Sequence, residues 1–355
     1  MNINANFFPD AVNLLKQLIS IPSISGEEDQ LADFLENALK EKKYHPMRKG
    51  NNIWLSSPNR DDRKPTILLN SHIDTVKPTA GWTKNPFQPL EEAGKLYGLG
   101  SNDAGASLVS LLQVFFILTQ NQQNNNFIFL ASCEEEISGK NGIESVLSEL
   151  PSIDLGVVGE PTSMQPAIAE KGLMVLDGIV YGKAGHAARE EGENAIYKAI
   201  PAIEWFQNKC FSEVSPLLGA VKMTVTGIQA GIQHNVIPDE CKFTVDIRTN
   251  ELYTNKALFD AISADCGVEV QVRSFRLKSS RIAINHPLVQ RAIGLGMIPF
   301  GSPTLSDQAL MRFPSLKIGP GNSARSHTAD EFIFLTEIDN AITQYIALLN
   351  NLKIK

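Results

Sequence analysis

The chain has few cysteines, and they form no recognisable motif. Its 355 residues include four of them, Cys133, Cys210, Cys241 and Cys266, with no Cys-x-x-Cys pair. A disulfide framework or a cysteine-based zinc site is therefore not expected. We interpret the four as reduced thiols of a cytoplasmic protein, each with a packing role.

Positive charge and long apolar runs are also scarce. Lys and Arg number 32 against 39 Asp and Glu, a formal net charge of −7, which argues against nucleic acid or an anionic membrane as a partner. The apolar stretch 108–118 is broken by Ser110 and Gln113, and no run approaches the roughly 20 residues that span a bilayer. No signal peptide is expected, because no basic segment followed by an apolar one begins the chain.

What the sequence does contain is alternation of strands and helices. With 43% hydrophobic residues, the chain can bury a large core and form two domains. Strands are expected at 52–56, 66–70, 127–131 and 155–159. Helices are expected at 10–20, 104–120 and 141–149, and a further helix with Leu31, Phe34, Leu35 and Leu39 on one face follows a capping box of Ser25 and Glu28. This order predicts an α/β fold, a mixed and mostly parallel sheet covered by helices.

The pattern changes after Glu160 and later returns. Strands at 172–182, 242–248 and 268–274 and helices at 193–209 and 254–265 form an inserted second domain, residues 165–277. The catalytic domain is then residues 1–164 and 278–355. Its last part contains helices at 286–295 and 336–352 and a short strand at 315–318.

An acidic triplet, Glu134–Glu136, directly follows one buried strand. Three adjacent carboxylates repel one another unless a cation or a shared proton neutralises them, although a solvated acidic loop would also tolerate them. Ligands of such sheets gather beyond the carboxyl ends of the strands. Other acids and histidines lie at comparable positions: His72, Asp74, Asp103, Glu160 and His327. We interpret the set as a two-metal hydrolase site in which one of the glutamates is the base.

Each motif is weak by itself. In His72-Ile73-Asp74, strand alternation turns both polar side chains the same way. His72 could then bind a metal while a carboxylate fixes its ring, but a structural histidine is the alternative. The segment 98–103 lacks the third glycine of a dinucleotide loop. It is better explained as a tight turn that presents Asp103 at the start of a helix, where one carboxylate could bridge two cations.

Taken in order, the motifs resemble those of one family. They are His72-Ile73-Asp74, Gly98-x-Gly100-x-x-Asp103, Glu135-Glu136, Gly159-Glu160-Pro161-Thr162, Gly185-His186 and His327. The set resembles the two-zinc amidohydrolases (M20-type metallopeptidases) that include acetylornithine deacetylase, succinyl-diaminopimelate desuccinylase and related aminoacylases and carboxypeptidases. In length the chain is most similar to the acetylornithine deacetylase branch.

The resemblance implies a role for each residue. Two Zn²⁺ ions per chain, with Co²⁺ or Mn²⁺ as substitutes, would be held by His72 and Glu160 on one side and by Glu136 and His327 on the other. Asp103 would bridge the ions and Asp74 would orient His72. Glu135 would be the general base and Glu134 a flanking acid, although spacing alone does not distinguish the three glutamates.

The resemblance also implies a role for the inserted domain. It would be a ferredoxin-like lid that forms a homodimer, and His186 would reach across the dimer to stabilise the oxyanion. Asn235 and Arg248 match segments that bind substrate. The Arg248 guanidinium suits an α-carboxylate, but an ion pair with Asp246 is an alternative. The turn at Gly321 could offer N–H groups to a carboxylate, or be an ordinary loop.

The expected function is hydrolysis of an N-acyl amino acid. N-acetylornithine or N-succinylornithine, in arginine biosynthesis, is the expected substrate, and a dipeptidase or aminopeptidase with the same metal site is the alternative. A catalytically silent binding protein is a further alternative from another class. Gly105-Ala106 stands where relatives often have Lys-Gly, and Glu134 stands where Asp is usual. These departures remove no ligand but weaken the transfer of substrate specificity.

Overall fold

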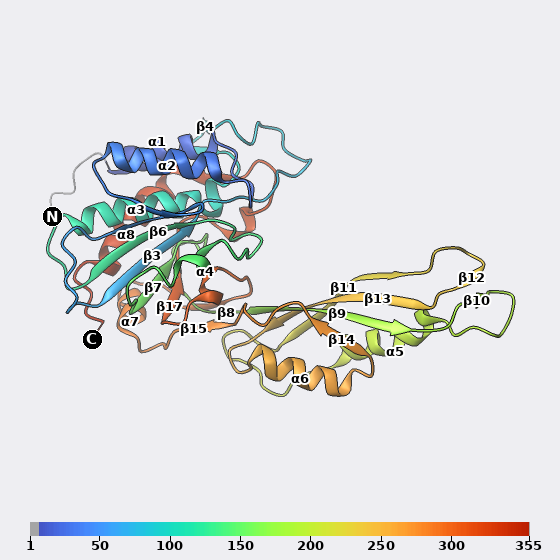
Figure 1. The fold of residues 1–355 in the computed structure, drawn as a ribbon. Helices are drawn as coiled ribbons and strands as arrows, with labels where there is room; N and C mark the ends of the chain where they lie inside the picture. The colour runs from blue at the N-terminus through green and yellow to red at the C-terminus, as the bar shows by residue number, and fades with distance from the viewer. Residues whose placement is uncertain (1–6, 355) are drawn as a thin grey trace. The chain divides into compact units, whose positions relative to one another are not determined.

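The computed structural model describes residues 7–354 and forms two compact units (Figure 1). Of these residues, the first unit comprises 7–168, 282–300 and 306–354, and the second comprises 169–281 and 301–305. The second unit thus begins at Ala169 and ends at Arg281, compared with the expected 165 and 277. It also takes in five residues from a later part of the chain.

A parallel sheet forms the centre of the first unit. Its four central strands are β6 (Asn126–Ser132), β3 (Thr66–His72), β7 (Leu155–Val158) and β17 (Ser315–Lys317), each parallel to its neighbour. Antiparallel strands flank them: β1 (Met47–Lys49) and β2 (Asn52–Ser56) beside β6, and β8 (Ala167–Glu170) beside β17. Strands β15 (Ser280–Arg281) and β16 (Phe300–Ser302) pair with β8.

Helices cover both faces of this sheet. Helix α3 (Ala106–Thr119) packs on one face, where the Phe115 ring lies 6.4 Å from that of Phe129. Helices α1 (Phe7–Ile19) and α8 (Leu335–Leu349) pack against α3, and α7 (Pro287–Gly294) packs against α8. The short α4 (Ile143–Val146) covers Leu68, Ile128 and Leu130 on the opposite face. The predicted fold class is confirmed.

Two local predictions need correction. The Ser25 hydroxyl donates to Asp74 Oδ2 at 2.6 Å and caps no helix, so the capping box is wrong. Helix α2 (Asp29–Glu41) follows Glu28, whose side chain makes no capping bond. The helix predicted to begin at residue 104 instead begins as a turn, η1 (Ser101–Gly105), that leads into α3.

One helical stretch among the described residues is long and apolar enough to cross a membrane. It is Ser101–Thr119, with a mean hydropathy of 1.3, and 83% of it is buried inside the protein. Almost every side chain of α3 is buried, because the helix lies between the sheet and two other helices. Burial of this kind is typical of a core helix.

Shorter elements surround the edge of the first unit. A small sheet consists of β18 (Phe332–Phe334), β5 (Lys95–Tyr97) and β4 (Leu90–Glu92), in that order. Two 3-10 turns, η2 (Asp307–Leu310) and η3 (Ser323–Arg325), lie between β16 and β18 in sequence. Of these segments, β18 and η3 adjoin the turn η1, which holds the candidate ligand Asp103.

The second unit has a βαββαβ order. It consists of β9 (Gly172–Tyr181), α5 (Ala195–Asn208), β11 (Lys222–Ala230), β13 (Glu240–Thr249), α6 (Asn255–Asp265) and β14 (Glu269–Val272). The sheet order is β11-β13-β9-β14 and all pairings are antiparallel. This is the split βαβ arrangement of ferredoxin-like folds. A two-stranded ribbon, β10 (Gly185–His186) with β12 (Val236–Ile237), is separate from that sheet.

Candidate metal centre

Strand register brings the candidate ligands to one edge of the sheet. His72, the last residue of β3, lies opposite Ser132, the last residue of β6. On the other side of β3, Asn70 pairs with Val158 at the end of β7. The acidic triplet begins two residues after Ser132, and Glu160 comes two residues after Val158. Parallel pairing therefore places both next to His72, as expected for a site beyond the carboxyl ends of strands.

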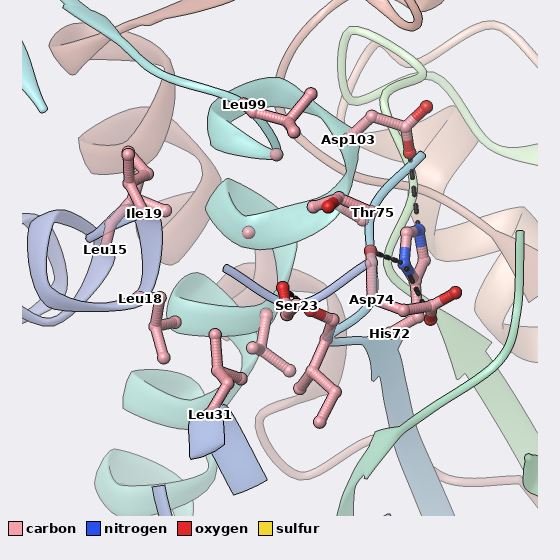
Figure 2. A pocket seen from close by; sticks show the side chains of 15 residues that line it. Leu15, Leu18, Ile19, Ser23, Leu31, His72, Asp74, Thr75, Leu99 and Asp103 are labelled. Carbon is pink, nitrogen blue, oxygen red and sulfur yellow. Dashed lines mark hydrogen bonds and ion pairs between the residues drawn. The ribbon is translucent and has the colours of Figure 1, made fainter. Parts of the chain in front are cut away.

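The first group of ligand atoms is His72, Asp103 and Glu160. His72 Nε2 lies 3.4 Å from Asp103 Oδ1 and 3.7 Å from Glu160 Oε1. Figure 2 shows the Asp103 carboxylate directed at the histidine ring, while the apolar side chains of α1 (Leu15, Leu18 and Ile19) line the opposite side of the same pocket. Only 2% of His72 is exposed.

The buried nitrogen of this histidine provides a test of fit for a cation. Among residues 7–354, Nε2 of His72 has no hydrogen-bond partner. A buried polar atom without a partner is costly. A cation between this nitrogen and the two carboxylates would remove that cost, since imidazole and carboxylate are typical zinc ligands. The donor set therefore fits a metal ion.

The second group is Asp103, Glu136 and His327. His327 Nε2 lies 3.0 Å from Glu136 Oε2 and 3.7 Å from Asp103 Oδ2. The two oxygens of Asp103 thus face one histidine each, which is the geometry of a bridging ligand. His327 lies in a loop with a left-handed backbone (φ +59°), and its side chain is 53% exposed. Both groups together can hold two metal ions.

Asp74 connects His72 to the acidic triplet. One of its carboxylate oxygens lies 3.5 Å from His72 Nδ1, and the same ring nitrogen lies 2.9 Å from the Asp74 carbonyl oxygen. The carboxylate also accepts the backbone N–H groups of Glu135 (3.0 Å) and Glu136 (3.1 Å). Because His72 is held through Nδ1, its Nε2 is left to face the metal position.

The three glutamates, which spacing could not distinguish, point to different partners. Glu134 accepts hydrogen bonds from the backbone and side-chain N–H groups of Asn141, and Glu136 faces His327. Glu135 is the member left without either engagement, and it is partly buried. Burial, followed by the charge of Glu160, raises its pKa well above the usual range. A carboxyl with a raised pKa is suited to holding a proton.

Crowding of negative charge shifts other pKa values too. Burial, and then the charge of Asp103, raise the pKa of Glu160 to about 8. A hydrogen bond to Glu136 raises the pKa of His327 to about 9. Cations between these groups would favour the carboxylate and neutral imidazole forms, and so would lower both values. Such perturbed groups in one cluster are typical of functional sites.

Two buried carboxylates beside the site were not predicted. Asp307 in η2 accepts a hydrogen bond from Ser132 at 2.7 Å, and burial raises its pKa to about 6. Glu331 accepts backbone N–H groups from the turn that carries Asp103. Neither follows a strand predicted from sequence. An acid four residues after His327 was the only available signal for Glu331.

Three of the predicted site residues, His186, Asn235 and Arg248, lie in the second unit. His186 is exposed in the β10–β12 ribbon, where the backbone carbonyl of Asn235 accepts the N–H of Ala187. His186 Nδ1 accepts the N–H of Ala188 at 3.1 Å. Arg248 pairs with both oxygens of Asp246, at 2.8 and 3.0 Å. This is the ion pair named as the alternative, and a substrate carboxylate would have to compete with it.

Gly321 lies in the first unit beside the Asp103 turn. Its φ is +85°, and a Cβ there would meet Asn102 Oδ1 at 2.3 Å, so the position requires glycine. The neighbouring N–H groups of Gly319 and Asn322 already donate to Thr162 and Asn102. A role for this turn in substrate binding stays a prediction.

Two groups of His and carboxylate ligands that share one aspartate, at the strand ends of an α/β sheet, define the class of dinuclear metallohydrolases. The chain belongs to Peptidase family M20/M25/M40, whose model matches residues 68–351. It is a metal-dependent amidohydrolase.

Known relatives span nearly the whole chain. A succinyl-diaminopimelate desuccinylase of Corynebacterium glutamicum is 27% identical, with 95% of this chain and 96% of the relative covered. An acetylornithine deacetylase of Proteus mirabilis is 26% identical, covering 96% and 95%. The crystal structure of a dinuclear metal-binding peptidase of the M20 family from Bacillus subtilis has a TM-score of 0.72 and 19% identity, with 98% of each chain covered. Its similarity shows that the fold is shared.

Proposed function

We propose that the protein hydrolyses the amide bond of an N-acyl-L-amino acid, with N-acetylornithine or N-succinylornithine as substrate, in arginine biosynthesis. The observation that carries this is the pair of ligand groups sharing Asp103, with Glu135 beside them. Relatives named for deacetylation and desuccinylation of small amino acids support the substrate class.

The two ions would be zinc. They would lower the pKa of the attacking water and polarise the scissile carbonyl. His72 and Glu160 would hold one ion, Glu136 and His327 the other, and Asp103 both. Glu135 would take the proton from the attacking water and pass it to the departing amine.

The smaller unit would act as a lid and a dimerisation domain. Large apolar side chains are exposed on it, including Tyr197 and Ile200 of α5 and Ile228 of β11. Contact with a second chain would bury these side chains and so stabilise a homodimer. His186 would then stabilise the oxyanion in the partner's site. His186→Ala should keep both metals while lowering kcat by about 10²–10³-fold; loss of metal would contradict this placement.

All four cysteines, which lie within the described residues, are free thiols, and this supports a cytoplasmic location.

A dipeptidase or aminopeptidase is the alternative activity. It is supported by the family's peptidase members, among them the Bacillus subtilis protein.

The test is amine release from N-acetylornithine and N-succinylornithine, assayed in parallel with zinc-loaded protein. Each assay is repeated after chelation and after zinc is restored. Zinc-dependent turnover supports the proposal, and the ratio of kcat/KM values identifies the acyl group. Two bound zinc ions without turnover of either compound would overturn the substrate assignment, and a dipeptide panel would then test the alternative. A protein that binds no metal would match the silent binding protein.

A further inference from the structure

Glu331 is a buried carboxylate that none of the catalytic steps above uses. Only 2% of it is exposed. Its Oε1 accepts the backbone N–H groups of Asn102 (2.8 Å) and Asp103 (2.9 Å), and its Oε2 accepts that of Gly100 (3.0 Å). Its backbone carbonyl accepts the N–H of Gly98 at 3.1 Å. One residue therefore binds four N–H groups of a single turn.

That turn determines where the bridging ligand lies. Gly100 has a left-handed backbone (φ +74°), and Asp103 has non-helical angles (φ −122°, ψ 97°) where the chain enters α3. The backbone of the turn is therefore not fixed by regular helix geometry. A buried carboxylate is stable only if its oxygens are hydrogen-bonded, so the turn and Glu331 stabilise each other.

The same residue lies on the segment that carries the other ligand. His327 precedes Glu331 by four residues, and its Nε2 is 3.7 Å from Asp103 Oδ2. Asp330, the residue before Glu331, binds another loop: its carboxylate accepts the backbone N–H groups of Thr83 and Lys84 and the hydroxyl of Thr83. Of these two acids, Glu331 is the one that hydrogen-bonds to the Asp103 turn among residues 7–354.

We propose that Glu331 is a positioning residue that joins the Asp103 turn to the His327 segment, and so sets the distance between two ligands of the second metal ion. The inference rests on the proposed two-metal site. It assigns Glu331 no contact with substrate or metal. Its effect is larger on the second ion, because Asp103 and His327 both lie on the segments that Glu331 connects, whereas Asp103 is the one ligand of the first group that does.

The test is calorimetric titration of the metal-free full-length protein with Zn²⁺, for wild type, Glu331→Gln and Glu331→Ala. The glutamine side chain keeps one acceptor oxygen. In place of the other carboxylate oxygen it has an NH₂ group, which cannot accept the backbone N–H that faces it. We expect the affinity for the second ion to fall about 10–100-fold in this variant, with a smaller change for the first ion. Glu331→Ala removes all three side-chain bonds and should lose more.

A second readout separates positioning from general destabilisation. Co²⁺ absorption reports ligand geometry, and we expect the bands of the second ion to weaken in Glu331→Gln while those of the first persist. Thermal unfolding of each metal-free variant identifies any that fail to fold. Asp330→Asn is the matched control: Asp330, next to Glu331 in the chain, also accepts backbone N–H groups, from Thr83 and Lys84, but among residues 7–354 it makes no hydrogen bond to the Asp103 turn. It should bind both ions as wild type does.

The outcomes separate this inference from the proposed function. Wild type that fails to bind two ions would overturn the two-metal site, and the role of Glu331 with it. Wild type that binds two ions while folded Glu331→Gln binds them equally tightly would overturn only the inference. An equal loss in Asp330→Asn would also overturn it, because anchoring of the His327 segment in general would then explain the effect.

Discussion

The two ligand groups share Asp103 but are built in different ways. In the first, His72 is buried at the end of β3, and its second ring nitrogen is held by Asp74. In the second, His327 lies half-exposed in a loop with a left-handed backbone, and Glu136 follows a strand in an irregular segment. Ligands on rigid strands need little ordering when an ion binds. We therefore expect the first ion to bind more tightly than the second.

The largest expected effect is on catalysis, and it leaves both ligand groups unchanged. Glu135→Gln removes the proposed base but none of the ligands, so both ions should remain. Loss of general-base catalysis should lower kcat by about 10²–10⁴-fold. Steady-state kinetics and metal analysis of one preparation measure both quantities, and near wild-type turnover would exclude Glu135 as the base.

Replacing the histidine of one ligand group at a time tests whether the two groups bind their ions separately. His327→Ala should leave one ion per chain, because His72, Asp103 and Glu160 remain. His72→Ala should instead abolish the tighter site, and its effect on affinity should exceed the 10–100-fold typical of residues that only orient a ligand. Metal content after dialysis at a fixed free Zn²⁺ concentration distinguishes the variants. Identical losses in both would show that the groups are not independent.

Asp74→Asn should affect both groups at once. Asp74 holds the ring of His72 and also accepts the N–H groups of Glu135 and Glu136. The amide keeps one acceptor oxygen, and the affinity for each ion should fall about 10–100-fold. Ser25→Ala is a milder companion, since it removes one neutral donor to the same carboxylate. A change confined to the first ion would contradict the link to the triplet.

The smallest expected effect concerns metal-free protein. There the folded-state pKa values of Glu160, about 8, and His327, about 9, lie above their ordinary values of 4.5 and 6.5. The folded state then binds more protons than the unfolded state between about pH 4.5 and 9, so its stability should decrease as pH rises through this range. Asp74 and Asp103, whose pKa values are lowered, titrate below this range.

Zinc should abolish much of that decrease, because bound cations replace the protons. Thermal unfolding of chelated and zinc-loaded protein from pH 6 to 9 measures the difference. The gap between their Tm values should widen with pH. A constant gap would mean that the crowded carboxylates do not destabilise the metal-free fold.

Sequence pattern predicted the elements with long, regular periodicity. The strands of the parallel sheet and the core helix α3 follow from apolar runs, and the fold class follows from their order. Strand β11 was not predicted. Its Lys222, Thr224 and Thr226 are exposed, as is much of the strand, so its hydrophobic signal is weak.

Sequence pattern singled out residues of the candidate site that the structure brings together, but not their geometry. His72 and the glutamate triplet stand out because polar residues directly follow buried strands. Glu331 gives no such signal, because its partners are backbone N–H groups more than 200 residues earlier in the chain. Ser25 was misassigned for a related reason: a hydroxyl at helix-cap spacing instead bonds Asp74, 49 residues away. Tertiary hydrogen bonds of this kind cannot be deduced from local spacing.

Stepwise zinc binding to the metal-free protein tests the central claim most directly. The account predicts two ions per chain with unequal affinities, and loss of only the weaker one in His327→Ala. A single ion per chain in the wild-type protein, or two ions whose affinities His327→Ala leaves unchanged, would contradict it.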